Sequence, residues 1–149
     1  MGNRQDSLTP GMLKEAEREL LKFSKMDLSE IEVRKVVIDQ EGNHITTLLI
    51  GDSSLPKLVI VHGYGGSGVL MYRLFKDLSR VFRVIAIDIL GMGSSSRPPF
   101  TCETGEEADM YCMDFMEKWR VAMKDLDFFV LAGHSYGGYL AGTYASLYP

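Results

Sequence analysis

The stretch Gly133-His134-Ser135-Tyr136-Gly137-Gly138 decides the fold. It fits the pattern G-x-S-x-G, and it lies between an apolar run that ends at Ala132 and a segment of helical composition. In that context the serine stands on a sharp turn that lifts its hydroxyl above a sheet. Side chains at Gly133 and Gly137 would collide there. The pattern therefore predicts that Ser135 is a catalytic nucleophile; the alternative is a tight strand-to-helix turn without chemistry.

A second glycine-rich turn, His62-Gly63-Tyr64-Gly65-Gly66-Ser67-Gly68, follows the apolar run 57–61. In acyl transfer such a turn offers a backbone N–H to the oxyanion, and the residue after the nucleophile offers another. We therefore expect Tyr64 and Tyr136 to supply the two oxyanion donors. Gly65 is the less favoured alternative to Tyr64.

The same turn also matches G-x-G-x-x-G, the pattern of a dinucleotide-binding loop. Asp88 follows about twenty residues later, at the end of the next apolar run, where a ribose-binding acid would stand. This alternative leaves the stretch around Ser135 unexplained, and a turn that opens with His62-Gly63 is natural for an oxyanion loop. When a serine on such a strand-to-helix turn works with a catalytic acid and a histidine, the acid follows the serine in the sequence. Asp88 precedes Ser135, so we interpret Asp88 as structural. It opens a third turn, Asp88–Pro98, and would brace the catalytic face.

The three histidines are His44, His62 and His134. We interpret His62 as a residue that holds the oxyanion loop rather than as a catalytic base. His134 directly precedes the nucleophile, and we expect its side chain to point to the other side of the strand end. None of the three is placed to take the proton from Ser135, and a serine hydroxyl is a weak nucleophile without a base. We therefore expect this chain alone to be inactive or nearly so.

Apolar strands alternate with helices along the chain, which predicts an α/β fold with helices on both faces of a mostly parallel sheet. A length of 149 residues suits a single domain, here a partial one over residues 1–149. We expect a leader helix, which packs on the domain or contacts a membrane, then an antiparallel hairpin and a βαβαβα core. The expected segments are the leader helix 9–25, the hairpin 31–50 with strands 31–38 and 44–50, and the core 57–149 with strands 57–61, 84–89 and 127–132 and helices 70–78 and 106–124.

Composition narrows the classes of partner. The formal net charge is −4, which gives no reason to expect nucleic acid. Cys102 and Cys112 match neither a disulfide framework nor a metal motif, so we expect no metal. The segment Met1–Ser7 lacks a secretory signal, and the sequence after Gly2 does not meet the myristoylation pattern. No run approaches about 20 apolar residues, the length that spans a bilayer. An intracellular, non-secreted protein is expected.

The turns resemble the lipid-directed subfamily of the α/β-hydrolase superfamily. This subfamily includes N-acyl phospholipid lipases, a lipid-droplet lipase coactivator, lysophosphatidic acid acyltransferase-like proteins and mitochondrial cardiolipin deacylases. The coactivator branch has asparagine in place of the nucleophile, whereas Ser135 is present here, so the resemblance favours a catalyst. The matching stretches are Leu13–Glu17, His62–Gly65, Asp88–Pro98, Glu117–Arg120 and Gly133–Leu140.

The resemblance implies a serine ester hydrolase or acyltransferase that acts on acyl lipids without a cofactor. A non-catalytic binding subunit or lipase coactivator is the alternative. The resemblance is compatible with peripheral contact with a membrane or lipid droplet. It is also compatible with a cytoplasmic, membrane-associated or mitochondrial location. The acid, the histidine and the lid of this family fall in the second half of its fold, beyond Pro149. Strand 128–132 would be central there. We therefore expect a second chain or a C-terminal half to complete the N-terminal half seen here.

Overall fold

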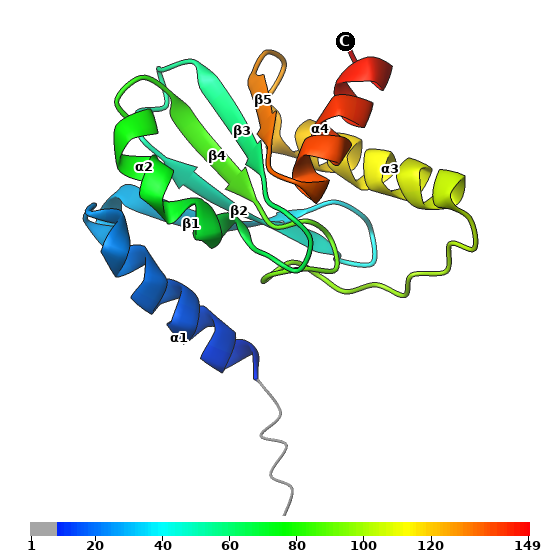
Figure 1. The fold of residues 1–149 in the computed structure, drawn as a ribbon, viewed down its shortest axis with the longest axis horizontal. Helices are drawn as coiled ribbons and strands as arrows, with labels where there is room; N and C mark the ends of the chain where they lie inside the picture. The colour runs from blue at the N-terminus through cyan, green and yellow to red at the C-terminus, as the bar shows by residue number, and fades with distance from the viewer. Residues whose placement is uncertain (1–8) are drawn as a thin grey trace, which may run out of the picture.

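The computed structural model describes residues 9–149, and the sequence-based expectations for Met1–Ser7 lie outside this range. Five strands form one sheet in the order β1-β2-β4-β3-β5 (Figure 1). The strands are β1 (Ile31–Val37), β2 (His44–Ile50), β3 (Lys57–Val61), β4 (Arg83–Ile87) and β5 (Val130–Gly133). The helices are α1 (Pro10–Leu21), α2 (Tyr72–Leu78), α3 (Gly105–Met123) and α4 (Tyr136–Leu147), with short 3₁₀ turns η1 (Lys22–Ser24), η2 (Leu28–Glu30) and η3 (Gly68–Met71).

The sheet combines an antiparallel hairpin with a parallel half. β1 and β2 pair antiparallel around a turn in which Gly42 has a φ of 82°. β2 also pairs antiparallel with β4, whereas β3 pairs parallel with both β4 and β5. The predicted α/β class, with its N-terminal hairpin and mostly parallel core, is confirmed. The carboxyl ends of the three parallel strands therefore meet at one edge, where open α/β sheets bind their ligands.

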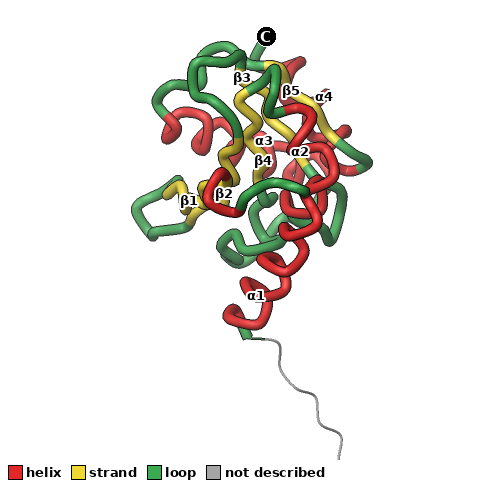
Figure 2. The backbone as a smooth tube through the Cα atoms, turned by 90° about the vertical axis from the view of Figure 1, so that its left-hand side faces the viewer, coloured by secondary structure: helices red, strands yellow, loops and turns green. Residues whose placement is uncertain are grey.

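Helices cover both faces of the sheet, and each face has its own apolar core (Figures 1 and 2). On one face α3 and α4 bury Phe115, Trp119 and Leu140 against the strands. On the other face η3, α2 and the end of α1 bury Val69, Phe75 and Leu21. A polar atom inside the first core is satisfied, because the Trp119 indole N–H donates to Thr47 Oγ1 at 3.0 Å.

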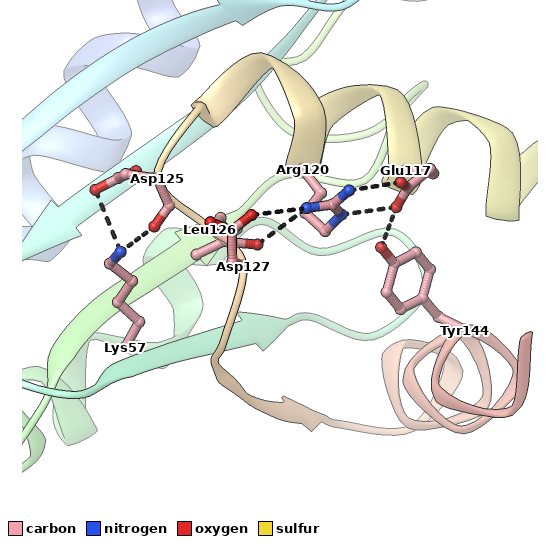
Figure 3. Close-up of polar contacts among 7 residues, drawn as sticks. All are labelled: Lys57, Glu117, Arg120, Asp125, Leu126, Asp127 and Tyr144. Atoms are coloured by element: carbon pink, nitrogen blue, oxygen red, sulfur yellow. Dashed lines mark hydrogen bonds and ion pairs between the residues drawn. The ribbon is translucent and has the colours of Figure 1, made fainter. Parts of the chain in front are cut away.

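A polar network joins α3 to α4 and to the segment that leads into β5 (Figure 3). Arg120 donates two hydrogen bonds to the Glu117 carboxylate, at 2.9 and 2.8 Å, and a third to Leu126 O at 3.2 Å. Tyr144 on α4 donates to the same carboxylate. The bidentate hydrogen bonds from Arg120 lower the pKa of Glu117 and keep it ionised. The stretch 117–120, noticed only as a resemblance, thus orients the helix that follows Ser135.

The last strand differs from its prediction as a buried strand over 127–132. β5 begins at Val130, and the side chains of Val130 and Phe128 are 52% and 91% exposed. Its only neighbour among the described strands is β3, so its outer edge has no partner in residues 9–149. A strand with one neighbour leaves its other hydrogen-bonding edge open, and the side chains next to that edge are less covered than those of a central strand.

Three helices also differ from the simple periodic reading. The leader helix stops at Leu21 and passes into η1, which ends where Lys25 takes a left-handed φ of 61°. The apolar positions Leu70 and Leu74 are exposed, since Phe75 is the buried residue of α2. On α4 the buried face runs through Gly137, Leu140, Ala141 and Tyr144, whereas the sequence predicts small residues, Gly138, Ala141, Gly142 and Ala145, on the covered face; Gly142 is exposed.

Candidate functional site

Ser135 lies at the carboxyl end of β5, on a strained turn that begins α4. Its φ is 55° and its ψ is −119°, values that L-residues other than glycine rarely adopt. A Cβ on Gly133 would stand 2.1 Å from Gly137 O, and one on Gly137 would stand 2.2 Å from Val61 O. Both glycines are therefore required by close backbone contacts, and the serine side chain is exposed above the sheet.

The glycine-rich turn after β3 lies directly against this elbow. The His134 N–H donates to Val61 O at 3.0 Å, which continues the parallel pairing of β3 and β5 into the two turns. A Cβ on Gly63 would stand 3.3 Å from the Ser135 Cβ. The rings of Tyr64 and Tyr136 meet edge to face, with centroids 6.3 Å apart. The two turns that the sequence singled out are therefore neighbours in space.

The backbone N–H groups of Tyr64 and Tyr136 differ from their neighbours at this junction. The Gly65 N–H donates to the Met92 sulfur at 3.3 Å, and the Gly66 N–H donates to Gly63 O at 3.1 Å. In contrast, the backbone N–H groups of Tyr64 and Tyr136 make no hydrogen bond within the described part of the chain. An oxyanion hole needs unengaged donors beside the nucleophile. On this criterion Tyr64 and Tyr136 fit better than Gly65.

His62 joins the ends of two strands. Its side chain is fully buried, its Nε2 accepts the Ile89 N–H at 2.9 Å, and its Nδ1–H donates to Gly63 O at 2.7 Å. These partners fix the tautomer with the proton on Nδ1. Burial lowers the pKa of His62, which keeps the ring neutral, although the hydrogen bond to Gly63 opposes the shift. Both ring nitrogens are therefore engaged by the backbone.

Asp88 holds the second and third turns together. Its carboxylate is buried and accepts the Gly68 N–H at 2.6 Å and the Ser94 N–H at 2.7 Å. Burial raises the pKa of Asp88, and the two amide hydrogen bonds oppose this shift. A Cβ on Gly93 would stand 2.3 Å from Asp88 Oδ2, so the carboxylate fills the space under that turn. An acid enclosed in this way cannot contact a ribose, which removes the basis of the dinucleotide alternative.

Residues 56–149 match the family described as alpha/beta hydrolase fold. The chain belongs to this family. Its strained serine turn, the adjoining glycine-rich turn and the parallel strands beneath them are the parts of an alpha/beta hydrolase that this chain supplies.

Relatives place the chain among lipid-directed alpha/beta hydrolases and confirm the resemblance seen in the motifs. It is 49% identical over 104 residues to a probable 1-acylglycerol-3-phosphate O-acyltransferase of Oryza sativa subsp. japonica, a match covering 70% of this chain and 25% of that protein. It is 40% identical over 139 residues to the 1-acylglycerol-3-phosphate O-acyltransferase ABHD5 of Mus musculus, covering 92% of this chain and 38% of that protein. The chain thus spans well under half the length of these relatives.

Solved structures share the fold. A bacterial membrane phospholipase A superposes with a TM-score of 0.70 and 24% identity over 92% of this chain and 39% of its own. A lipase of Acinetobacter baumannii superposes with a TM-score of 0.73 and 20% identity over 99% of this chain and 45% of its own. At these identities the likeness concerns the fold alone.

The described residues of this alpha/beta hydrolase bring Ser135 close to two unengaged amides, but bring no histidine to it. The His44 Nδ1 accepts from Ser96 Oγ at 2.8 Å, so this side chain holds the third turn. The His134 Nδ1 would stand 3.2 Å from a Cβ on Gly63, so this ring lies beside the glycine-rich turn after β3. No histidine side chain in residues 9–149 hydrogen-bonds Ser135.

Sequence reasoning missed one half-buried acid near the site. Glu17 on α1 accepts the Ser94 hydroxyl at 2.9 Å through Oε2, whereas its Oε1 is buried without a partner. Burial raises the pKa of Glu17, and the charge of Asp88 adds to this shift. The sequence signal was the stretch 13–17, which was noticed only as a resemblance. This contact ties the leader helix to the third turn.

A small pocket lies beside the oxyanion loop. It measures about 270 Å³ and lies between Tyr64 and Gly65 on one side and Met92, Gly93 and Arg97 on the other. The Arg97 guanidinium donates to Gly93 O at 2.7 Å and to Ser95 O at 3.1 Å, which leaves further N–H groups for a ligand. In the part of the chain that is described, no three acidic, histidine or cysteine side chains gather as metal ligands. None of the described helices is long and apolar enough to cross a bilayer.

Proposed function

We propose that the protein containing this chain is a serine hydrolase or acyltransferase that acts on acyl lipids. Ser135 is the nucleophile, and the backbone N–H groups of Tyr64 and Tyr136 hold the oxyanion. The observation that carries this proposal is the strained Ser135, with a φ of 55°, next to two unengaged amides. Backbone strain costs stability, and proteins keep it where it is used.

The chemistry follows from this arrangement. Ser135 Oγ attacks the acyl carbonyl, its proton passes to a base outside the described residues, and the carbonyl oxygen becomes an oxyanion facing the two amides. Collapse of this intermediate releases the lipid alcohol and leaves an acyl-serine. Water then completes a hydrolysis, or an acceptor hydroxyl completes an acyl transfer. Losing one oxyanion donor typically costs about 10²–10³-fold in rate.

A phosphate-bearing acyl lipid suits the surroundings of the site. The relatives named as 1-acylglycerol-3-phosphate O-acyltransferases support this class of substrate. The pocket beside Tyr64 supports it independently, because Arg97 places a guanidinium there, and planar guanidinium groups pair well with phosphate.

The test is a comparison of Ser135→Ala with Ser146→Ala in the full-length protein. Ser146 lies on the same helix and donates only to Thr143 O, so it controls for loss of a hydroxyl from α4. We expect Ser135→Ala to abolish fatty acid release from an acyl-glycerophospholipid, together with labelling by a fluorophosphonate. Ser146→Ala should retain both, and the melting temperature of each variant reports folding. Turnover retained in Ser135→Ala would refute the mechanism, and a folded wild-type protein that takes no label would instead favour the binding role.

A further inference from the structure

A cationic groove lies between η1 and α2, away from the serine. It measures about 640 Å³, and a single carboxylate, that of Asp77, lines it. Its cationic side chains are Lys25, Arg73, Lys76 and Arg80. Arg80 pairs with Asp77 at 3.5 Å, whereas the other three have no ion pair with any described residue.

The groove carries a net positive charge, whereas the rest of the protein carries a net negative charge. Four cations against one carboxylate give it a net charge of +3, and the whole chain carries −4, so the remainder carries −7. Like charges gathered on one surface repel each other and lower stability unless an anion neutralises them. The groove is therefore suited to a partner that carries several negative charges.

Exposed apolar side chains lie on the same or adjoining elements as the cations, and Phe23 lines the groove itself. Phe23 on η1 is 70% exposed, and Leu70 and Leu74, one turn apart on η3 and α2, are 51% and 48% exposed. Arg73 lies next to Leu74 in the chain and is exposed as well. Cations interleaved with large exposed apolar groups are the composition of a surface that sits at a lipid–water interface.

We propose that this groove and its apolar border bind the surface of an anionic phospholipid bilayer. The four cations contact lipid phosphates, while Phe23, Leu70 and Leu74 enter the boundary between headgroups and acyl chains. A nucleic acid or an acidic peptide would use the cations but would gain nothing from the exposed leucines. The charge of −7 on the rest of the chain turns the other faces away from the membrane.

This docking brings the serine site to its substrate. Leu70 also packs at the oxyanion loop, where a Cβ on Gly66 would stand 3.2 Å from Leu70 Cδ1. η3 continues directly from that loop, and both follow β3. A protein held to the bilayer by α2 therefore keeps the loop beside Ser135 close to the lipid surface. The docking itself does not depend on the activity proposed above.

The test measures binding of the full-length protein to vesicles of equal parts phosphatidylglycerol and phosphatidylcholine, by co-sedimentation. We expect Arg73→Gln/Lys76→Gln to lower the partition coefficient by about thirtyfold, since each lost cation weakens binding to an anionic surface. Phe23→Ala should lower it by about tenfold. The matched control Lys118→Gln/Lys124→Gln removes the same charge from α3 and the residue that caps its C-terminus, and it should bind as the wild type does; melting temperatures report folding.

Several results would overturn the proposal. One is equal loss of binding in the groove variant and the α3 control, which would reduce the effect to net charge. Another is equal binding to vesicles of pure phosphatidylcholine. A third is stabilisation by inorganic phosphate alone with no vesicle binding, which would assign the groove to a soluble anion. The same assay on Ser135→Ala keeps the two proposals separate, because a loss of catalysis leaves this binding unchanged.

Discussion

Gly137→Ala and Gly142→Ala make the same chemical change on one helix and should have opposite effects. A Cβ at Gly137 would stand 2.2 Å from Val61 O and 2.4 Å from His62 O, whereas a Cβ at Gly142 meets nothing within 4 Å. Ordinary contact begins at 3.4 Å, so α4 and the end of β3 would have to part by about 1 Å. The obstructing atoms belong to the backbone and cannot rotate away.

The size of each effect follows from these contacts. Forcing a methyl group into a packed site costs about 1–3 kcal/mol and sometimes more. Alanine in place of an exposed helical glycine gains about 0.5–1 kcal/mol. We therefore expect Gly137→Ala to lower the free energy of unfolding by about 2 kcal/mol and Gly142→Ala to raise it slightly. With a urea dependence of about 1–3 kcal/mol/M, the two midpoints should differ by about 1 M or more.

The assay is equilibrium urea unfolding of the full-length protein, with fluorophosphonate labelling of Ser135 alongside. Gly137→Ala should also label more slowly, because the same separation displaces the oxyanion loop from the elbow. Equal midpoints for the two variants would refute the reasoning, since they would mean that Gly137 does not touch the end of β3. A destabilised Gly137→Ala that labels at the wild-type rate would separate stability from the geometry of the site.

Three further predictions concern buried groups. Thr47→Val should lower the free energy of unfolding by about 1–3 kcal/mol in thermal melts, because the buried Trp119 N–H loses its acceptor while the shape of the side chain is kept; a Thr47→Val variant as stable as the wild type would contradict this role. Burial raises the pKa of Glu17 above 4.5, so the folded state holds this proton more tightly than the unfolded state does, and stability should fall as the pH rises from 4.5 through the folded pKa. Glu17→Gln should reduce this dependence of the urea midpoint on pH. An unchanged dependence would contradict the assignment. Burial also raises the pKa of Cys112, so iodoacetamide should modify Cys102 first in native protein, as peptide mass mapping can check; equal rates would mean that Cys112 is accessible.

Short sequence patterns predicted the two glycine-rich turns correctly, because these turns depend on contacts between residues of the patterns themselves. The need for glycine at Gly133 and Gly137 comes from atoms in adjoining turns, and a short pattern records it. Strand composition likewise placed β3, whose bounds match the expected 57–61. The exposure of Val130 and Phe128, in contrast, depends on which elements pack beside β5, and the composition of one strand does not encode that.

Side-chain direction was the weakest part of the prediction. Leu70 and Leu74 fit an apolar helix face, yet the short helix turns Phe75 inward and leaves both leucines in solvent. The strained backbone of Ser135 places His134 beside a turn that lies about seventy residues earlier, and no periodic rule describes that contact. Glu17 reaches Ser94 across 77 residues, so its role exists only in the folded chain.

The pairing of β3 with β5 fixes the order in which the protein can be built. Leu58 pairs with Val130, whereas the hairpin pairs Val37 with His44. Contacts between distant residues must close a long loop, so they form slowly, and a ribosome delivers β5 last among these strands. We expect the hairpin to fold first and the Ser135 turn to gain its strained conformation only after β3 and β5 have met. In a nascent chain the Ser135 hydroxyl would then stay unreactive until the sheet is assembled.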